Sequence, residues 1–126
     1  MPFFSRFKKK NTVKFEKVAA QPGFTLETEN GDCGPVTEQR LGEALIDLAR
    51  SQDGFVVLTA PHAVRDVRYV QACTSENGVH FEIGIEKEDT RLYEKQCTVD
   101  ECRRCFFAFL RGEFDPDPAE YKPAEF

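Results

Sequence analysis

The sequence lacks any apolar run of the roughly 18 residues that a membrane-spanning helix needs. It begins with a basic segment, Met1–Lys10, but neither an apolar run nor a small-residue cleavage site follows, as a secretory signal would require. Internal repeats and low-complexity tracts are absent as well. With 126 residues, 40% hydrophobic and 31% charged, we expect a soluble, cytoplasmic protein with a single hydrophobic core.

Motifs of the common catalytic sites are also missing. The chain has no glycine-rich phosphate loop, nucleophile elbow or Ser/His/Asp set. The segment Gly31–Gly34 contains two glycines but lacks the Lys-Ser/Thr pair that opens a P-loop helix. His62 follows Pro61 in an expected turn, and nothing in the sequence marks Cys33 as a nucleophile. The sequence therefore predicts a protein that is not an enzyme.

The five cysteines favour a reducing compartment over a disulfide scaffold, because their number is odd and the chain can form a core. Cys97, Cys102 and Cys105 have the spacing of the first three ligands of a plant-type [2Fe–2S] ferredoxin. Zinc bound by three cysteines with His80 or His62 is a second possibility. However, no cysteine follows Cys105 as a fourth ligand, and the intervening residues favour a helix. We predict core packing, with no metal and no cofactor, and keep a cysteine-ligated metal or redox protein as the alternative.

The net charge of −5 is unevenly distributed. Residues 1–17 contain six Lys/Arg and one Glu, whereas residues 113–126 contain five Asp/Glu and one Lys. The acidic total argues against nucleic-acid binding. The basic N-terminal arm, with its interleaved phenylalanines, either makes weak contact with an anionic membrane surface or packs against the domain. We favour packing, since one short basic arm gives only marginal membrane affinity.

A β-hairpin is the strongest local prediction. Asn77 and Gly78 suit a type I′ turn, in which both central residues need a positive φ, and this turn would pair Val79 with Glu76. Alternation along the strands predicts a core face of Val70, Ala72, Val79, Phe81, Ile83 and Ile85. The opposite, polar face would contain Tyr69, Gln71, Cys73, Ser75, His80, Glu82, Gly84 and Glu86.

A capped helix follows a short strand at Arg91–Gln96. Thr98 and Glu101 have the spacing of a capping box, in which each side chain satisfies the backbone amide of the other residue. Gly112 is a suitable residue to end the helix. The apolar stripe expected on this helix comprises Cys102, Cys105, Phe106, Phe109 and Leu110.

The first half of the chain predicts a hairpin and a helix. Strands at Val13–Val18 and Phe24–Thr28 would flank a turn at Gln21–Gly23, and Asn30–Pro35 would form a loop. A helix would start at its N-cap Thr37, with Val36 packing against its first turn, and would end at Gly54. Its expected buried stripe is Leu41, Ala44, Leu45, Leu48 and Ala49.

The segment after this helix predicts a buried strand and a turn. Phe55–Leu58 is a compact apolar run, and Pro61–Arg65 would turn the chain into the hairpin. The prolines after Phe114 predict an extended, non-helical tail. We therefore expect an α+β fold with the element order β-β-α-β-β-β-β-α, in which two amphipathic helices cover one face of an antiparallel sheet. The organisation would be a basic arm (1–10), one domain (11–112) and an acidic, proline-containing tail (113–126).

A non-catalytic protein-interaction domain is the function that these features favour. The exposed sheet face would bind a basic protein partner through Tyr69, Gln71, His80, Glu82 and Glu86. His80 and Glu82 also form a His-x-Glu pattern that suits a metal or acid–base pair, but a solvated polar strand face explains it more simply. By analogy of size, charge and architecture alone, the role would be immunity/antitoxin-like or chaperone-like. The acidic tail would either order on a partner or lie over its own domain.

Overall fold

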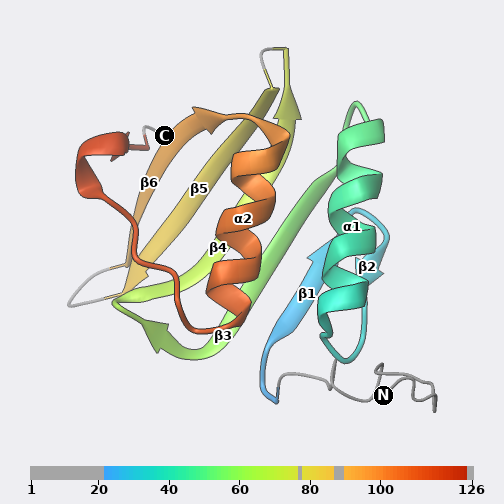
Figure 1. The fold of residues 1–126 in the computed structure, drawn as a ribbon, viewed down its shortest axis with the longest axis horizontal. Helices are drawn as coiled ribbons and strands as arrows, with labels where there is room; N and C mark the ends of the chain where they lie inside the picture. The colour runs from blue at the N-terminus through green and yellow to red at the C-terminus, as the bar shows by residue number, and fades with distance from the viewer. Residues whose placement is uncertain (1–21, 77, 87–89, 125–126) are drawn as a thin grey trace, which may run out of the picture.

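The computed structural model describes residues 22–76, 78–86 and 90–124, which form a seven-stranded antiparallel sheet with two helices on one face (Figure 1). The strands are β1 (Thr25–Thr28), β2 (Gly31–Asp32), β3 (Phe55–Val64), β4 (Val67–Ser75), β5 (Gly78–Glu86), β6 (Thr90–Cys97) and β7 (Lys122–Pro123). The helices are α1 (Glu38–Arg50), α2 (Val99–Leu110) and the short 3-10 helix η2 (Pro118–Glu120). The strands lie in the order β2-β1-β3-β4-β5-β6-β7. The predicted α+β class and element order are confirmed, with η2 and β7 added at the end.

The core fills the space between the helices and the inner face of the sheet. Phe81 of β5 packs edge-to-face against Phe106 of α2, with ring centroids 5.7 Å apart. Phe24 makes a similar contact with Phe109 at 5.9 Å. Helix α1 buries Leu41, Ala44, Leu45 and Leu48. Ala49, which the sequence placed in that stripe, is exposed, because the helix turns it away from the sheet.

Both ends of α2 follow the sequence prediction. Thr98 accepts a hydrogen bond from the backbone amide of Glu101, and the Glu101 side chain accepts one from the Thr98 amide, so the capping box is complete. At the other end Gly112 has a φ of +74°. Its amide bonds to the carbonyl of Phe109, and the next amide bonds to the carbonyl of Ala108. This pair of bonds is a Schellman motif, which satisfies the last carbonyls of the helix.

Helix α1 begins as predicted but ends earlier. The Thr37 side chain accepts a hydrogen bond from the Arg40 amide, which makes Thr37 the N-cap. The C-cap is Ser51 rather than a residue beside Gly54, because Ser51 is already extended, with φ −101° and ψ 148°. Part of the predicted loop Asn30–Pro35 is strand β2, which pairs with β1.

The β4–β5 hairpin has the predicted faces but a register shifted by two residues. Its innermost pair is Ser75 with Gly78, and Val79 pairs with Thr74 rather than Glu76. Gly78 is needed within the ladder, because a Cβ there would lie 2.7 Å from the carbonyl oxygen of Cys97 on β6. A shift of two residues keeps every side chain on its predicted face.

The turn between β3 and β4 differs from the prediction. Strand β3 continues through Pro61 to Val64, with a register irregularity between Thr59 and Val64, and the chain reverses at Arg65 and Asp66. Both turn residues have positive φ, 49° and 70°. Arg65 is held by hydrogen bonds from its guanidinium to the carbonyls of Gly112 and Phe114, at 3.5 and 3.3 Å. The irregular register accommodates Pro61, which has no amide to donate to the ladder.

The C-terminal segment lies over its own domain. Phe114 is buried against Phe81 and Phe109, and β7 pairs with β6 at the edge of the sheet. The predicted extended, non-helical tail is therefore partly wrong, since η2 forms one helical turn with Asp117 as its N-cap. The expected strand Val13–Val18 and the basic arm lie outside the described residues. None of the helices in the described part of the chain has the length and apolar character needed to cross a bilayer.

Candidate functional site

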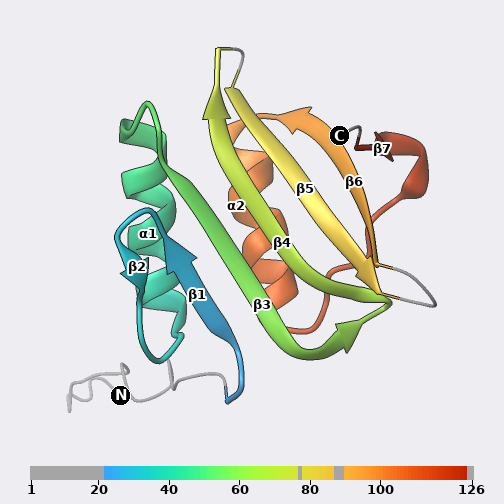
Figure 2. The same ribbon diagram turned by 180° about the vertical axis from the view of Figure 1, so that it is seen from behind.

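The second face of the sheet, called here the open face, is covered by no described helix (Figure 2). Alternation along the strands directs polar side chains to it, because the neighbouring residues fill the core. Across its middle, the ladder aligns one row of residues from six adjacent strands: Glu27, Val57, Gln71, Glu82, Glu94 and Lys122. The open face is thus a broad polar surface with three carboxylates in one line.

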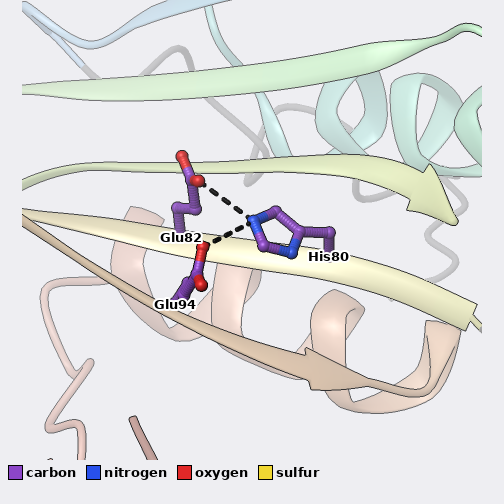
Figure 3. A group of neighbouring side chains, drawn as sticks. All are labelled: His80, Glu82 and Glu94. Atoms are coloured by element: carbon purple, nitrogen blue, oxygen red, sulfur yellow. Dashed lines mark hydrogen bonds and ion pairs between the residues drawn. The ribbon is translucent and has the colours of Figure 1, made fainter. Parts of the chain in front are cut away.

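Three side chains of β5 and β6 converge on the open face (Figure 3). The Nε2 atom of His80 lies 3.0 Å from Oε2 of Glu82 and 3.2 Å from Oε1 of Glu94. His80 and Glu82 are two residues apart on β5, and Glu94 is the direct partner of Glu82 on β6. Their side chains are only 27%, 17% and 18% exposed, so the groups are half-buried although the face is open.

Neighbouring side chains hold this cluster in place. Gln71 donates a hydrogen bond to the other carboxylate oxygen of Glu82. The Gln96 amide lies 3.3 Å from Nδ1 of His80, and Ser75 donates to Gln96 at 3.0 Å. In the tautomer with hydrogen on Nε2, His80 donates to the carboxylates and accepts from Gln96. The imidazole is therefore oriented from both sides.

Two carboxylates placed directly opposite each other repel, so the site has a negative potential. This negative potential changes the pKa values of neighbouring side chains. Burial and the nearby Glu82 carboxylate together raise the pKa of the Cys73 thiol and of the Tyr69 phenol. Lys122 offsets part of this charge, with its Nζ 3.9 Å from Oε2 of Glu94. The arrangement can accept a cation between the two strands.

A shallow hollow adjoins the cluster on the side of β3 and β4. It has a volume of about 280 Å³. Its floor and walls are Phe55, Val57, Gln71, Ala72, Cys73, His80 and Glu82. Phe55 is 37% exposed, an unusual exposure for a large apolar side chain next to charged groups. The hollow therefore combines an apolar wall with a carboxylate at one end.

The residues predicted to bind a partner are all on or beside the open face. Gln71, His80 and Glu82 belong to the cluster or touch it, whereas Tyr69 packs its ring over Gly84. Glu86 lies at the end of β5 and pairs with Arg68 at 3.2 Å. Sequence reasoning missed Glu94 and Gln96. Alternation within Arg91–Gln96 puts both on one face, but only the β5–β6 register brings them to His80 and Glu82.

The cysteines do not form a comparable group. Cys97 and Cys102 are buried and hydrogen-bond to each other, which lowers the pKa of Cys97 and, together with burial, raises that of Cys102. Cys73 lies on the open face of the sheet, away from these two buried thiols, and Cys33 lies in the loop before α1. Among the described residues, only His80, Glu82 and Glu94 bring three metal-binding side chains within 4.8 Å of one another. The described residues thus give the cysteine-ligated alternative no support.

Comparisons with known proteins found no match for this chain. No protein-family model, no curated protein and no solved structure matches the chain. Function is therefore inferred from the residues of the open face.

Proposed function

We propose that this chain is a non-catalytic protein-interaction domain whose open face binds a basic segment of a partner protein. The observation that supports this proposal is the pair of opposed carboxylates, Glu82 and Glu94, on an uncovered sheet face. They lie beside a hollow of about 280 Å³ with an apolar wall. A lysine or arginine side chain has the matching chemistry, because it joins an apolar stem to a cationic head.

The hollow suggests how such a side chain would bind. Its stem would lie against Phe55 and Val57, while its ammonium or guanidinium group would reach Glu82. A charge-assisted hydrogen bond in a half-buried setting is stronger than one at a fully exposed site. Tyr69, also on the open face, offers a neighbouring aromatic contact of the kind that often anchors an interface.

The charge of the whole chain favours the same class of partner. The formal net charge is −5, and the middle row of the open face has three glutamates and one lysine. Such a surface attracts a basic partner over a distance and repels an acidic one, which raises the rate of association. An immunity-type neutraliser of a basic toxin and a chaperone for a basic client would both use this surface. The identity of the captured partner distinguishes these two roles.

Selection from a displayed library of random peptides tests the proposal. The full chain, kept in a metal chelator, is the target. We expect the selected peptides to be enriched in Lys and Arg and to bind Glu82→Lys at least about tenfold more weakly, because the charge reversal places like charges together.

Asp47→Lys is the matched control. Asp47 is exposed on α1, so the same change of charge is made on the opposite side of the molecule. Peptides that show no basic enrichment, or that bind Glu82→Lys as tightly as they bind the unaltered chain, would overturn the proposal.

A further inference from the structure

We propose that His80, Glu82 and Glu94 together bind one divalent transition-metal ion, with Zn²⁺ as the ion that best fits these ligands. The three ligand atoms lie within 4.8 Å of one another, so side-chain rotations alone can bring them to the spacing that ligands have around a single ion. This site does not depend on the proposed partner, because the metal alone is its ligand.

The distances from the His80 nitrogen to the two carboxylates are close to those between ligands of a small tetrahedral ion. Zinc bonds to His nitrogen and to carboxylate oxygen at about 2.0–2.2 Å, which places neighbouring ligands about 3.3 Å apart in a tetrahedron. The His80 nitrogen lies 3.0 Å from the Glu82 oxygen and 3.2 Å from the Glu94 oxygen. Small rotations of the glutamate side chains would therefore be enough to admit the ion.

The types of ligand also point to zinc. Imidazole nitrogen suits zinc, iron, nickel and copper, whereas carboxylate oxygen alone suits magnesium, calcium and manganese. One imidazole with two carboxylates gives three protein ligands, and the fourth tetrahedral position would face solvent on the open face. Three protein ligands with one open position differ from the closed shell of four protein ligands that structural zinc sites have.

The surrounding residues fit the requirements of a metal site. A metal-binding histidine usually donates its second N–H to an oxygen acceptor, which fixes the ring. Gln96 lies 3.3 Å from Nδ1 of His80, and rotation of its amide would present the oxygen as acceptor. Gln71 holds the second oxygen of Glu82. These ligands come from two paired strands, which position side chains more rigidly than loops do.

The site also differs from an ordinary acidic surface cluster. A nitrogen ligand points between the two carboxylates, and all three side chains are less than one-third exposed. An ion would remove the repulsion between Glu82 and Glu94, which face each other across the ladder. Lys122, which pairs with Glu94, has a side chain that is 77% exposed, so it can move away when the metal enters.

Calorimetric titration with zinc chloride and absorbance titration with cobalt chloride test this proposal on the full chain. Cys73, which is exposed, and Cys33 and Cys105, which are partly exposed, are first replaced by serine, so that their thiols do not bind the probe. We expect one equivalent of metal and a cobalt spectrum without thiolate charge-transfer bands. Glu94→Gln and His80→Gln should each weaken binding by at least about tenfold.

Glu27→Gln is the matched control, since Glu27 lies in the same row of the open face but is separated from Glu82 by the two strands β3 and β4. The Glu27→Gln variant should bind zinc with the same affinity as its parent. Thermal unfolding of each variant without metal would show that the fold is retained.

The proposal is overturned if no saturable binding of one equivalent occurs, or if Glu94→Gln binds as tightly as its parent. Thiolate bands in the cobalt spectrum would also overturn it, because they would place the metal on the cysteines. The peptide selection is carried out in a chelator, so it gives the same result whether or not the chain binds zinc. The zinc titration contains no peptide, so it does not depend on partner binding.

Discussion

At the scale of single residues, the contact between Tyr69 and Gly84 is a closely packed point of the open face. The two residues are direct partners on β4 and β5. A Cβ at position 84 would overlap with ring carbons of Tyr69, so the ring occupies the space that a side chain would need. The sequence predicted both residues on one face, but not that the tyrosine covers the glycine.

Gly84→Ala is therefore expected to destabilise the fold by about 1 kcal/mol, because the tyrosine ring must move away from its packed position. Urea unfolding followed by circular dichroism measures this change. The same substitution in a Tyr69→Ala background should cost much less. An equal cost in both backgrounds would show that the tyrosine is not the cause.

At the scale of elements, the capping box of α2 is the clearest link between sequence and stability. Thr98→Ala removes the acceptor of the Glu101 amide, and we expect a loss of about 1 kcal/mol in the free energy of unfolding. Thr98→Ser keeps the hydroxyl and should lose only a small fraction of this. If serine proves as damaging as alanine, the hydrogen bond is not the source of the effect. Equilibrium unfolding in urea gives both values.

The elements also show what could be predicted from the sequence. Helix starts, the Gly112 end and the two faces of the central hairpin were predicted because they depend on neighbouring residues. The predicted hairpin register was wrong, because Gly78 pairs with Ser75 in the ladder and does not stand at the centre of the turn. The helical turn η2 and strand β7 were missed since they form only against the sheet edge and the buried core.

In the candidate site, too, features set by neighbouring residues were predicted, and features set by distant strands were not. Alternation put His80 and Glu82 on one face, and this required only the local strand pattern. Glu94 joins them through the β5–β6 register, which a single sequence does not fix. The partner-binding role of the predicted residues stays a prediction.

At the scale of the whole molecule, docking of the C-terminal segment joins the end of the chain to the core. The ring of Tyr121 lies 6.4 Å from that of Phe81, and Lys95 lies over the Tyr121 ring at 4.8 Å. Burial, and then the Cys105 thiol, raise the pKa of Tyr121 to about 12, although Lys95 acts in the opposite direction. Its ordinary value is 10.0.

This shift predicts a specific loss of stability in alkaline solution. The folded state holds the Tyr121 proton more tightly than the unfolded state, so the contribution is complete below about pH 10 and is lost as the pH rises to about 12. Tyr121→Phe keeps the ring but cannot ionise, and should therefore lose less stability than the unaltered chain between about pH 9 and about pH 11. Urea unfolding at the two pH values measures the difference. Equal losses would contradict a buried Tyr121 proton.

The short strands at the two edges of the sheet have a consequence for how the molecule meets others. In the part of the chain that the structure describes, each edge ends in a strand of two residues, β2 and β7. A strand of two residues is a poor template for an incoming strand, and Pro123 has no amide to donate. Addition of a further strand to β2 or β7 is thus disfavoured. The proposed partner would instead meet the open face, where side chains rather than backbone groups determine selectivity, so single substitutions would change its specificity.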